Sequence, residues 1–187
     1  MSQTALKYFT ESEYLALERA AQEKHEYYKG EIFAMSGTSF KHNVIQMNLL
    51  VLLGVYLENK SCTPFGSDLR VHIPKNSLYT YPDVLIVCDE PKFVDDEFDS
   101  LINPAVIIEI LSPSTANYDR GAKFDLYREI DSLKEYILID STKVHLVHYA
   151  KNADNTWTLS ETKNVEDQFS IPLVQFQATL ARIYKGA

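Results

Sequence analysis

Short, nearly continuous apolar runs are the strongest pattern along this chain. Residues 83–88 and 105–111 hold apolar side chains at almost every position, and residues 135–140 form a third run of this kind. Strands covered on both faces show such runs, whereas strands with one face in water alternate between apolar and polar residues. We therefore expect three buried strands in the central part of the chain.

Capping motifs predict where the helices begin. Thr10 and Glu13 match a capping box, in which the hydroxyl and the carboxylate satisfy backbone N–H groups at a helix start. We expect this helix over residues 11–25. A second, largely apolar helix follows over about residues 39–57, behind a threonine and a serine that can each cap it.

A third helix, between two of the apolar runs, indicates the fold class. Asp119 can cap a helix over residues 120–130, which connects the strand candidates 105–111 and 135–140. Strand, helix and strand in this order form the unit of an α/β sheet.

Weaker signals complete the chain. They mark two more strands, a hairpin and a closing helix: residues 30–35 and 67–73, residues 144–149 with 156–161, and residues 178–185. No repeat or flexible linker divides the sequence. We expect one α/β domain over residues 1–187, with a mixed sheet flanked by helices on both faces and a C-terminal β-hairpin extension.

The charge balance restricts the function. The 187 residues carry 18 Lys and Arg against 26 Asp and Glu, a net charge of −8. This excess argues against a protein that coats nucleic acid or an anionic membrane through its overall charge, but it leaves room for a local basic groove. Much of the excess lies in one loop-like segment, residues 89–99.

Cysteine usage and hydropathy predict the compartment. Cys62 and Cys88 are the only cysteines, too few for a disulfide framework or a cysteine metal site. The longest apolar stretch, residues 44–57, is interrupted by polar residues and is too short to span a bilayer, and the N-terminus lacks a signal pattern. We expect a cytoplasmic protein with reduced cysteines and no membrane association.

Two carboxylates stand out because they interrupt or open apolar strands. Glu109 lies inside the run at 105–111, and Asp83 opens the run at 83–88. A carboxylate in such a place is costly unless it is paired or binds a metal, and two of them on neighbouring strands could hold a hard divalent cation. The alternative is structural: Asp83 caps a strand or turn, and Glu109 pairs with a buried Arg or Lys.

A cation for these carboxylates is available on the third predicted helix. Arg120, Lys123 and Tyr127 are spaced three and four residues apart and share one helix face. Lys123 could point back at the carboxylates. Seen alone, a lysine on an amphipathic helix is more often a solvated residue.

Three motifs together resemble a known family. They are Tyr-Pro-Asp-Val-Leu-Ile-Val at 81–87, Glu-Ile-Leu-Ser-Pro-Ser-Thr at 109–115, and Tyr-Asp-Arg-Gly-Ala-Lys-Phe at 118–124, followed by Tyr127. The sequence resembles the Uma family of restriction-endonuclease-like proteins, a branch of the PD-(D/E)XK nuclease superfamily. The resemblance extends from about Phe9 to the C-terminus and implies a restriction-endonuclease-like fold.

The resemblance also implies a metal site. Asp83 and Glu109 would be ligands of Mg²⁺ or Mn²⁺, and the backbone carbonyl of Ile110 would add a third oxygen. The superfamily usually has a lysine two residues after the acid, where this chain has Leu111. Lys123 is the natural substitute, because the helix after the Glu109 strand can return an ammonium to the site.

The resemblance further suggests that Glu31 and His42 approach the same cleft as assisting catalytic residues. The alternative is a surface acid beside a turn and a histidine satisfied at a helix start. Gln46 shares a helix face with His42, Ser112 and Ser114 could contact phosphate or simply form a turn, and Asp68 and Tyr127 could support the ligands.

Two classes of function follow. The first is a metal-dependent endonuclease that hydrolyses phosphodiester bonds of DNA, acting as a homodimer because a duplex has two strands to cut. The second is a catalytically weak or inactive module on the same fold that binds nucleic acid or protein, with the acidic segment favouring a basic partner.

Overall fold

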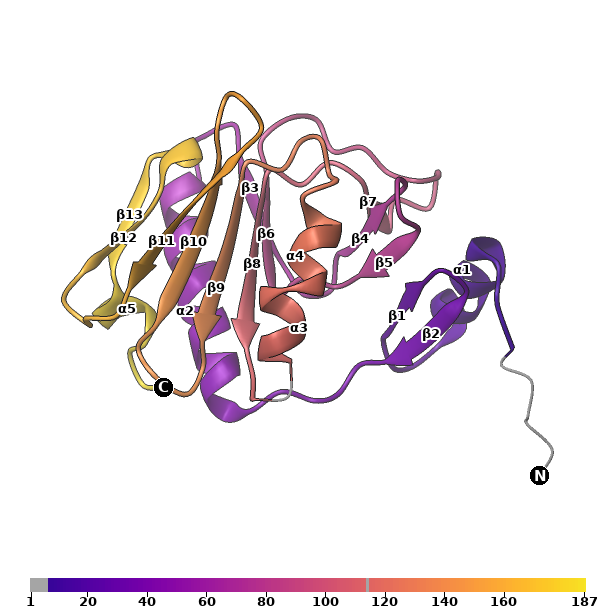
Figure 1. The fold of residues 1–187 in the computed structure, drawn as a ribbon, viewed down its shortest axis with the longest axis horizontal. Helices are drawn as coiled ribbons and strands as arrows, with labels where there is room; N and C mark the ends of the chain where they lie inside the picture. The colour runs from indigo at the N-terminus through magenta and orange to yellow at the C-terminus, as the bar shows by residue number, and fades with distance from the viewer. Residues whose placement is uncertain (1–6, 114) are drawn as a thin grey trace.

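A six-stranded mixed sheet runs through the centre of the molecule (Figure 1). The computed structural model describes residues 7–113 and 115–187. In spatial order the strands are β11 (Trp157–Thr162), β10 (Leu146–Lys151), β9 (Glu135–Asp140), β8 (Val106–Leu111), β6 (Val84–Val87) and β3 (Thr63–Gly66). β8 and β9 run parallel, and the other neighbouring pairs in this sheet are antiparallel. The expected mixed sheet and the three central strands are confirmed.

A second sheet carries most of the N-terminal part of the chain. Its strands, in spatial order, are β2 (Glu31–Ala34), β1 (His25–Tyr28), β5 (Leu78–Thr80), β4 (Arg70–Ile73) and β7 (Ser100–Leu101). Helix α1 (Glu11–Ala20) begins with the predicted capping box of Thr10 and Glu13. The buried ring of Tyr14 fixes α1 against this sheet through contacts with the rings of Tyr27 and Tyr79.

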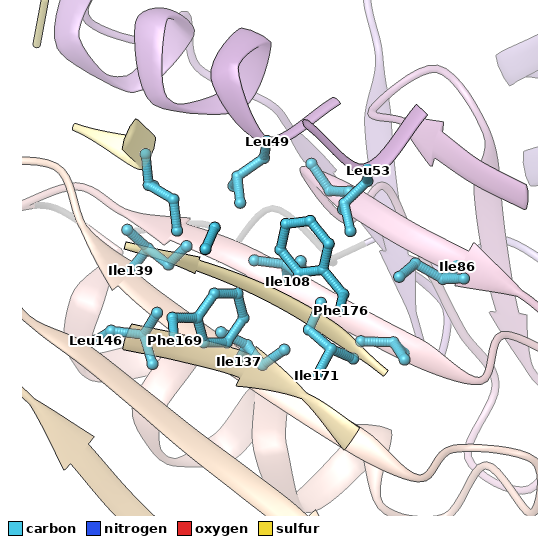
Figure 2. Close-up of a cluster of buried hydrophobic side chains, with 14 of the residues drawn as sticks. Leu49, Leu53, Ile86, Ile108, Ile137, Ile139, Leu146, Phe169, Ile171 and Phe176 are labelled. Atoms are coloured by element: carbon cyan, nitrogen blue, oxygen red, sulfur yellow. The ribbon is translucent and has the colours of Figure 1, made fainter. Parts of the chain in front are cut away.

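Helix α2 (Phe40–Leu57) and the C-terminal segment cover one face of the central sheet. The C-terminal segment contains the hairpin β12 (Gln168–Ile171) and β13 (Phe176–Thr179), the 3₁₀ turn Pro172–Val174 and the short helix α5 (Leu180–Ile183). Figure 2 shows Leu49 and Leu53 of α2 packed with Ile108 of β8 and Phe176 of the hairpin. Each such aliphatic side chain contributes about 1.5–3 kcal/mol when it leaves water.

The helices α3 (Ala116–Arg120) and α4 (Ala122–Tyr127) cover the opposite face, together with strands of the second sheet. Alternate residues of one strand therefore enter different cores. On β8, Ile108 packs beneath α2, whereas Ile107 and Leu111 pack beneath α4. This two-sided burial explains the continuous apolar runs, and it confirms helices on both faces of the sheet.

Several predicted boundaries are wrong because pairing between distant strands is invisible in local patterns. The first helix ends at Ala20, not residue 25, since His25–Tyr28 joins β2 and β5. The predicted strand at 67–73 begins only at Arg70, because residues 67–69 form the turn that carries the chain from β3 in one sheet to β4 in the other. The predicted helix at 178–185 shrinks to α5, because the residues before it pair as β13.

The structure has two short helices where the sequence predicted one helix over residues 120–130. Gly121 interrupts it with a non-helical backbone conformation (φ −114°, ψ −94°) and divides it into α3 and α4. Asp119 lies inside α3 instead of capping a helix, and the N-cap position belongs to Thr115. The predicted hairpin at residues 144–161 is confirmed as β10 and β11.

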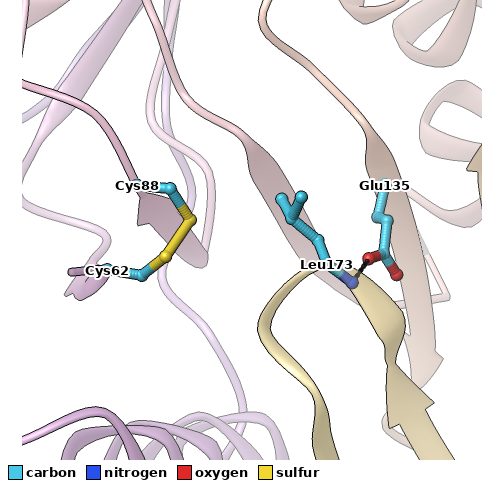
Figure 3. The surroundings of a disulfide bond; sticks show 4 residues. All are labelled: Cys62, Cys88, Glu135 and Leu173. Atoms are coloured by element: carbon cyan, nitrogen blue, oxygen red, sulfur yellow. Dashed lines mark hydrogen bonds between the residues drawn. A yellow bond between two sulfur atoms is a disulfide. The ribbon is translucent and has the colours of Figure 1, made fainter. Parts of the chain in front are cut away.

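The expectation of reduced cysteines is wrong in this structure. Cys62 and Cys88 form a disulfide between the segment preceding β3 and the end of β6 (Figure 3). The antiparallel register explains the pairing, because Thr63 lies opposite Val87 and the two cysteines are the next cross-strand pair. Within the described residues, no helix has both the length and the apolar character needed to cross a membrane.

Candidate active site

A cavity of about 360 Å³ opens where the two sheets, α2 and the α3–α4 pair meet. Its walls come from the ends of β6 and β8, from Glu26 of β1, from the segment between β2 and α2, and from α3 and α4. In Figure 1 that connecting segment passes along the lower edge of the molecule, beneath α3. Four carboxylates border the cavity: Glu26, Asp83, Glu109 and Asp119.

Strand pairing brings Asp83 and Glu109 together. Because Val84 pairs with Ile108 in the antiparallel ladder, Asp83 comes to lie opposite Glu109, and its N–H donates to Glu109 Oε2 at 3.4 Å. Both side chains border the same cavity, so the carboxylates do not lie on opposite sides of the sheet. The Ile110 N–H donates to Asp83 Oδ2 at 2.7 Å and holds this carboxylate against β8.

Helix α2 supplies two further groups to Asp83. His42 is buried, and its Nε2 lies 3.1 Å from Asp83 Oδ2. The Gln46 amide, one turn further along the helix, donates to the Asp83 backbone carbonyl at 2.8 Å. The predicted shared face of His42 and Gln46 therefore exists, and it fixes both the side chain and the backbone of Asp83.

Glu109 is held from the opposite wall by α4. Its Oε1 accepts a hydrogen bond from the Tyr127 hydroxyl at 2.7 Å and lies 2.9 Å from Lys123 Nζ. Burial raises the pKa of the Glu109 carboxyl above its usual range, Lys123 opposes this shift, and Asp83 and Asp119 add to it. The carboxylate is thus fixed at Oε1 while Oε2 faces Asp83.

Lys123 lies among three carboxylates. Its ammonium is 2.9 Å from Glu109 Oε1, 3.4 Å from Glu26 Oε1 and 3.7 Å from Asp119 Oδ1. Burial alone would lower the pKa of Lys123, but these acids and Tyr127 outweigh it and raise the pKa well above its ordinary value. The side chain is therefore a buried cation, not the solvated surface lysine of the alternative interpretation.

Sequence reasoning missed Glu26 and gave Asp119 a different role. Glu26 lies on β1 opposite Thr80, whose hydroxyl donates to it, and the expectation of a helix reaching residue 25 concealed this strand. Asp119 is buried four residues before Lys123, and burial raises its pKa. The spacing between Asp119 and Lys123 was a usable signal, because residues four apart on a helix face each other.

The remaining candidates from the sequence are divided between the cavity and the surface. Glu31 is exposed on β2 and does not border the cavity. Asp68 pairs with Lys24 at the surface, and Arg120 pairs with Asp140. Ser112 borders the cavity, whereas Ser114 lies outside the described residues.

The oxygen atoms around Asp83 and Glu109 suit a hard divalent cation. Among the described residues, Asp83 Oδ1 has no hydrogen-bond partner, and Glu109 Oε2 accepts only the long bond from Asp83. The Ile110 carbonyl faces the same edge as its N–H, because both groups of one strand residue point to the same side. In the described part of the chain, no three His, Cys, Asp or Glu side chains form a metal cluster, so a cation held by these two carboxylates would take its other oxygens from the backbone or from water.

Comparisons with known proteins give the family. Residues 11–181 match the model of the Uma2 family, described as "Putative restriction endonuclease". The Synechocystis sp. protein sll1609 is 40% identical over 166 residues, which cover 88% of this chain and 94% of the relative. A second Synechocystis sp. protein, slr1290, is 37% identical over 174 residues, covering 93% and 90% respectively.

A solved structure supports the fold independently. The crystal structure of "a putative nuclease belonging to DUF820" from Anabaena variabilis superposes with a TM-score of 0.72, covering 92% of this chain and 96% of that one. At 17% sequence identity this likeness shows the fold alone. Together with the family match along nearly the whole sequence, it shows that the chain belongs to the Uma2 family and has a restriction-endonuclease-like fold.

Proposed function

We propose that this protein is a metal-dependent endonuclease that hydrolyses phosphodiester bonds of DNA. The observation that carries the proposal is the approach of the buried Lys123 ammonium to Glu109, across the cavity from Asp83. Membership of a family described by a nuclease activity supports it. Two carboxylates and an ammonium at one cavity are the groups that phosphodiester hydrolysis requires.

Each residue has a role in this proposal. Asp83, Glu109 and the Ile110 carbonyl would hold Mg²⁺ or Mn²⁺, and the cation would supply Lewis-acid stabilisation of the phosphodiester under attack. Lys123 keeps a positive charge beside that position, where negative charge develops. His42 and Tyr127 orient the two carboxylates through their contacts with Asp83 and Glu109.

The alternative, a weak or inactive binding module, has two observations in its favour. Lys123 is engaged by three carboxylates, and Leu111, at the usual lysine position, packs into the core beneath α4. The acidic segment offers less support than its composition suggests, because Asp95 and Asp99 are paired with Arg19.

Cleavage of supercoiled, linear and single-stranded DNA in Mg²⁺ or Mn²⁺ separates the two functions. We expect wild-type protein to cut, EDTA to stop cutting, and both Glu109→Gln and Lys123→Ala to lose most of the activity. Glu166→Gln and Lys143→Ala change exposed residues outside the cavity and serve as matched controls. Equal cutting by all variants would reveal a contaminant, and no cutting by wild type with either metal would favour the binding module. The expected homodimer stays a prediction for gel filtration with light scattering.

A further inference from the structure

Three exposed aromatic side chains border the cavity or adjoin residues that border it. Phe40 at the start of α2 is 76% exposed, Phe33 on β2 is 47% exposed and Tyr118 on α3 is 41% exposed. They come from three separate elements, and Phe33 directly precedes Ala34, which borders the cavity. Tyr118 borders the cavity itself, and Phe40 directly follows Ser39, which also borders it.

The strand register fixes the direction of Phe33. Phe33 pairs with Glu26 across the β1–β2 ladder, and directly opposed residues of an antiparallel pair project to the same face. Glu26 uses that face to reach Lys123. Phe33 therefore lies on the cavity side of the hairpin, not on the side that packs against α1.

Each of the three rings is partly exposed to solvent. Among the described residues, neither another aromatic ring nor a Lys or Arg head group stacks on Phe33, Phe40 or Tyr118. Single exposed aromatics are ordinary on protein surfaces, but here they gather at the site that bears the carboxylates and the lysine. Nucleobases stack on such rings, and stacking accepts every base because every base has a π-face.

The charges at the cavity disfavour duplex DNA. Lys123 is the one Lys or Arg bordering the cavity within the described chain, and it shares the cavity with four carboxylates. Duplex DNA carries one negative charge per ~1.7 Å, about twice the density of a single strand. A site with so few cations recovers little binding energy from phosphates, so the bases must supply it.

The depth of Glu109 points the same way. This carboxylate is only 4% exposed, so a phosphodiester must enter the cavity to reach it. A single strand can bend into such a site, whereas a duplex has a persistence length of about 50 nm and bends over short distances only at considerable cost.

We propose that the substrate is single-stranded or locally unpaired DNA, whose bases stack on Phe33, Phe40 and Tyr118 while the backbone passes Asp83, Glu109 and Lys123. This inference deepens the proposed nuclease function and rests on it for the cutting step. Stacking itself requires only the rings at the cavity mouth. Binding and cleavage can therefore be tested separately.

The binding test compares fluorescein-labelled oligonucleotides by anisotropy in Ca²⁺, at fixed ionic strength and with oligonucleotide integrity checked on a gel. The probes are a 12-mer of dT, a duplex of the same length and a 12-mer of abasic sugar-phosphate. We expect the dT 12-mer to bind at least tenfold more tightly than both of the others. Phe33→Ala and Phe40→Ala should each weaken its binding by about tenfold, and Phe40→Trp should retain it.

Phe98→Ala is the matched control, because Phe98 is an exposed phenylalanine on a different surface pocket. Circular dichroism and thermal melts verify that each variant is folded.

Equal affinity for duplex and single strand, equal affinity for abasic and dT probes, or no effect of either Phe→Ala variant would overturn the inference. Ring-dependent binding without any cleavage would remove the nuclease proposal but keep the binding site. If Phe33→Ala and Phe40→Ala cut duplex DNA as efficiently as wild type, the nuclease proposal would stand and the stacking site would be removed.

Discussion

Lys123 has a structural role as well as the proposed catalytic one. It is the cation that separates Glu109, Glu26 and Asp119 inside a buried cluster. A lysine that only served the reaction could be removed without unfolding the protein. The structure predicts otherwise, because removal leaves the buried Glu109 and Asp119 and the half-buried Glu26 without their partner.

Lys123→Ala should therefore destabilise the fold by about 3–5 kcal/mol at pH 8, the usual cost of breaking a buried ion pair. The loss should shrink as the pH falls toward the ordinary carboxyl range, because protonated acids no longer repel each other. Urea unfolding at pH 5 and pH 8 measures both values. A pH-independent loss would indicate missing packing instead of unpaired charge, and Lys143→Ala provides the surface control.

Lys123→Arg tests the catalytic role apart from the charge. The guanidinium keeps the positive charge, so stability should be largely restored, but its planar head cannot occupy the position of an ammonium. We expect cleavage to stay about a hundredfold or more below wild type, the scale of losing one transition-state donor. Full activity in the arginine variant would show that charge alone is sufficient.

Cation binding should be linked to proton release at Glu109. Burial raises the pKa of this carboxyl, so part of the population carries a proton near neutrality, and a cation must displace it. Without a cation, the folded protein holds the Glu109 proton more tightly than the unfolded chain does. Folding stability therefore falls as the pH rises from the unfolded carboxyl pKa through the raised pKa of the folded state. Added Mg²⁺ should thus raise Tm more at pH 8.5 than at pH 6. A Tm gain that stays constant with pH, or persists in Glu109→Gln, would contradict this assignment.

At the scale of elements, helix α2 has two functions that its sequence only partly reveals. Its inner face packs Leu49 and Leu53 on the central sheet, and its first turns bring His42 and Gln46 to Asp83. Leu53→Ala should cost about 2–5 kcal/mol, because it leaves a cavity in a fully buried core. Val55 lies on the outer side of the same helix and is 73% exposed, so Val55→Ala should change stability by less than about 0.5 kcal/mol. Denaturant unfolding of the two variants side by side provides the comparison.

The elements also show which parts of the fold could be predicted from the sequence. Buried strands such as β8 and β9 were predictable because an apolar run is a local signal. Strands β1 and β5 were not predictable. They are only four and three residues long, and they acquire strand conformation by pairing with each other across some fifty positions of sequence. The break at Gly121 had a local signal, because glycine is a poor helix former, but that signal did not by itself fix the break.

The same distinction applies to the candidate site. Asp83, Glu109 and Lys123 could be proposed because each violates its local pattern or belongs to a recognisable motif. Glu26 could not, because its importance comes from a strand whose position depends on the second sheet. Glu31 shows the opposite error, since it lies on the same hairpin but remains exposed and outside the cavity.

At the scale of the whole molecule, charge should determine how DNA binding responds to salt. The chain has a net charge of −8, and within the described residues Lys123 is the one Lys or Arg at the cavity. Each neutralised phosphate of a single strand contributes about −0.7 to the slope of log K against log[salt]. With one or two phosphates engaged, the slope for a dT 12-mer in Ca²⁺ should therefore lie near −1. Anisotropy titrations from 50 to 300 mM NaCl measure it. A slope steeper than about −4 would require a basic surface away from the cavity and would remove the argument that stacked bases supply most of the affinity.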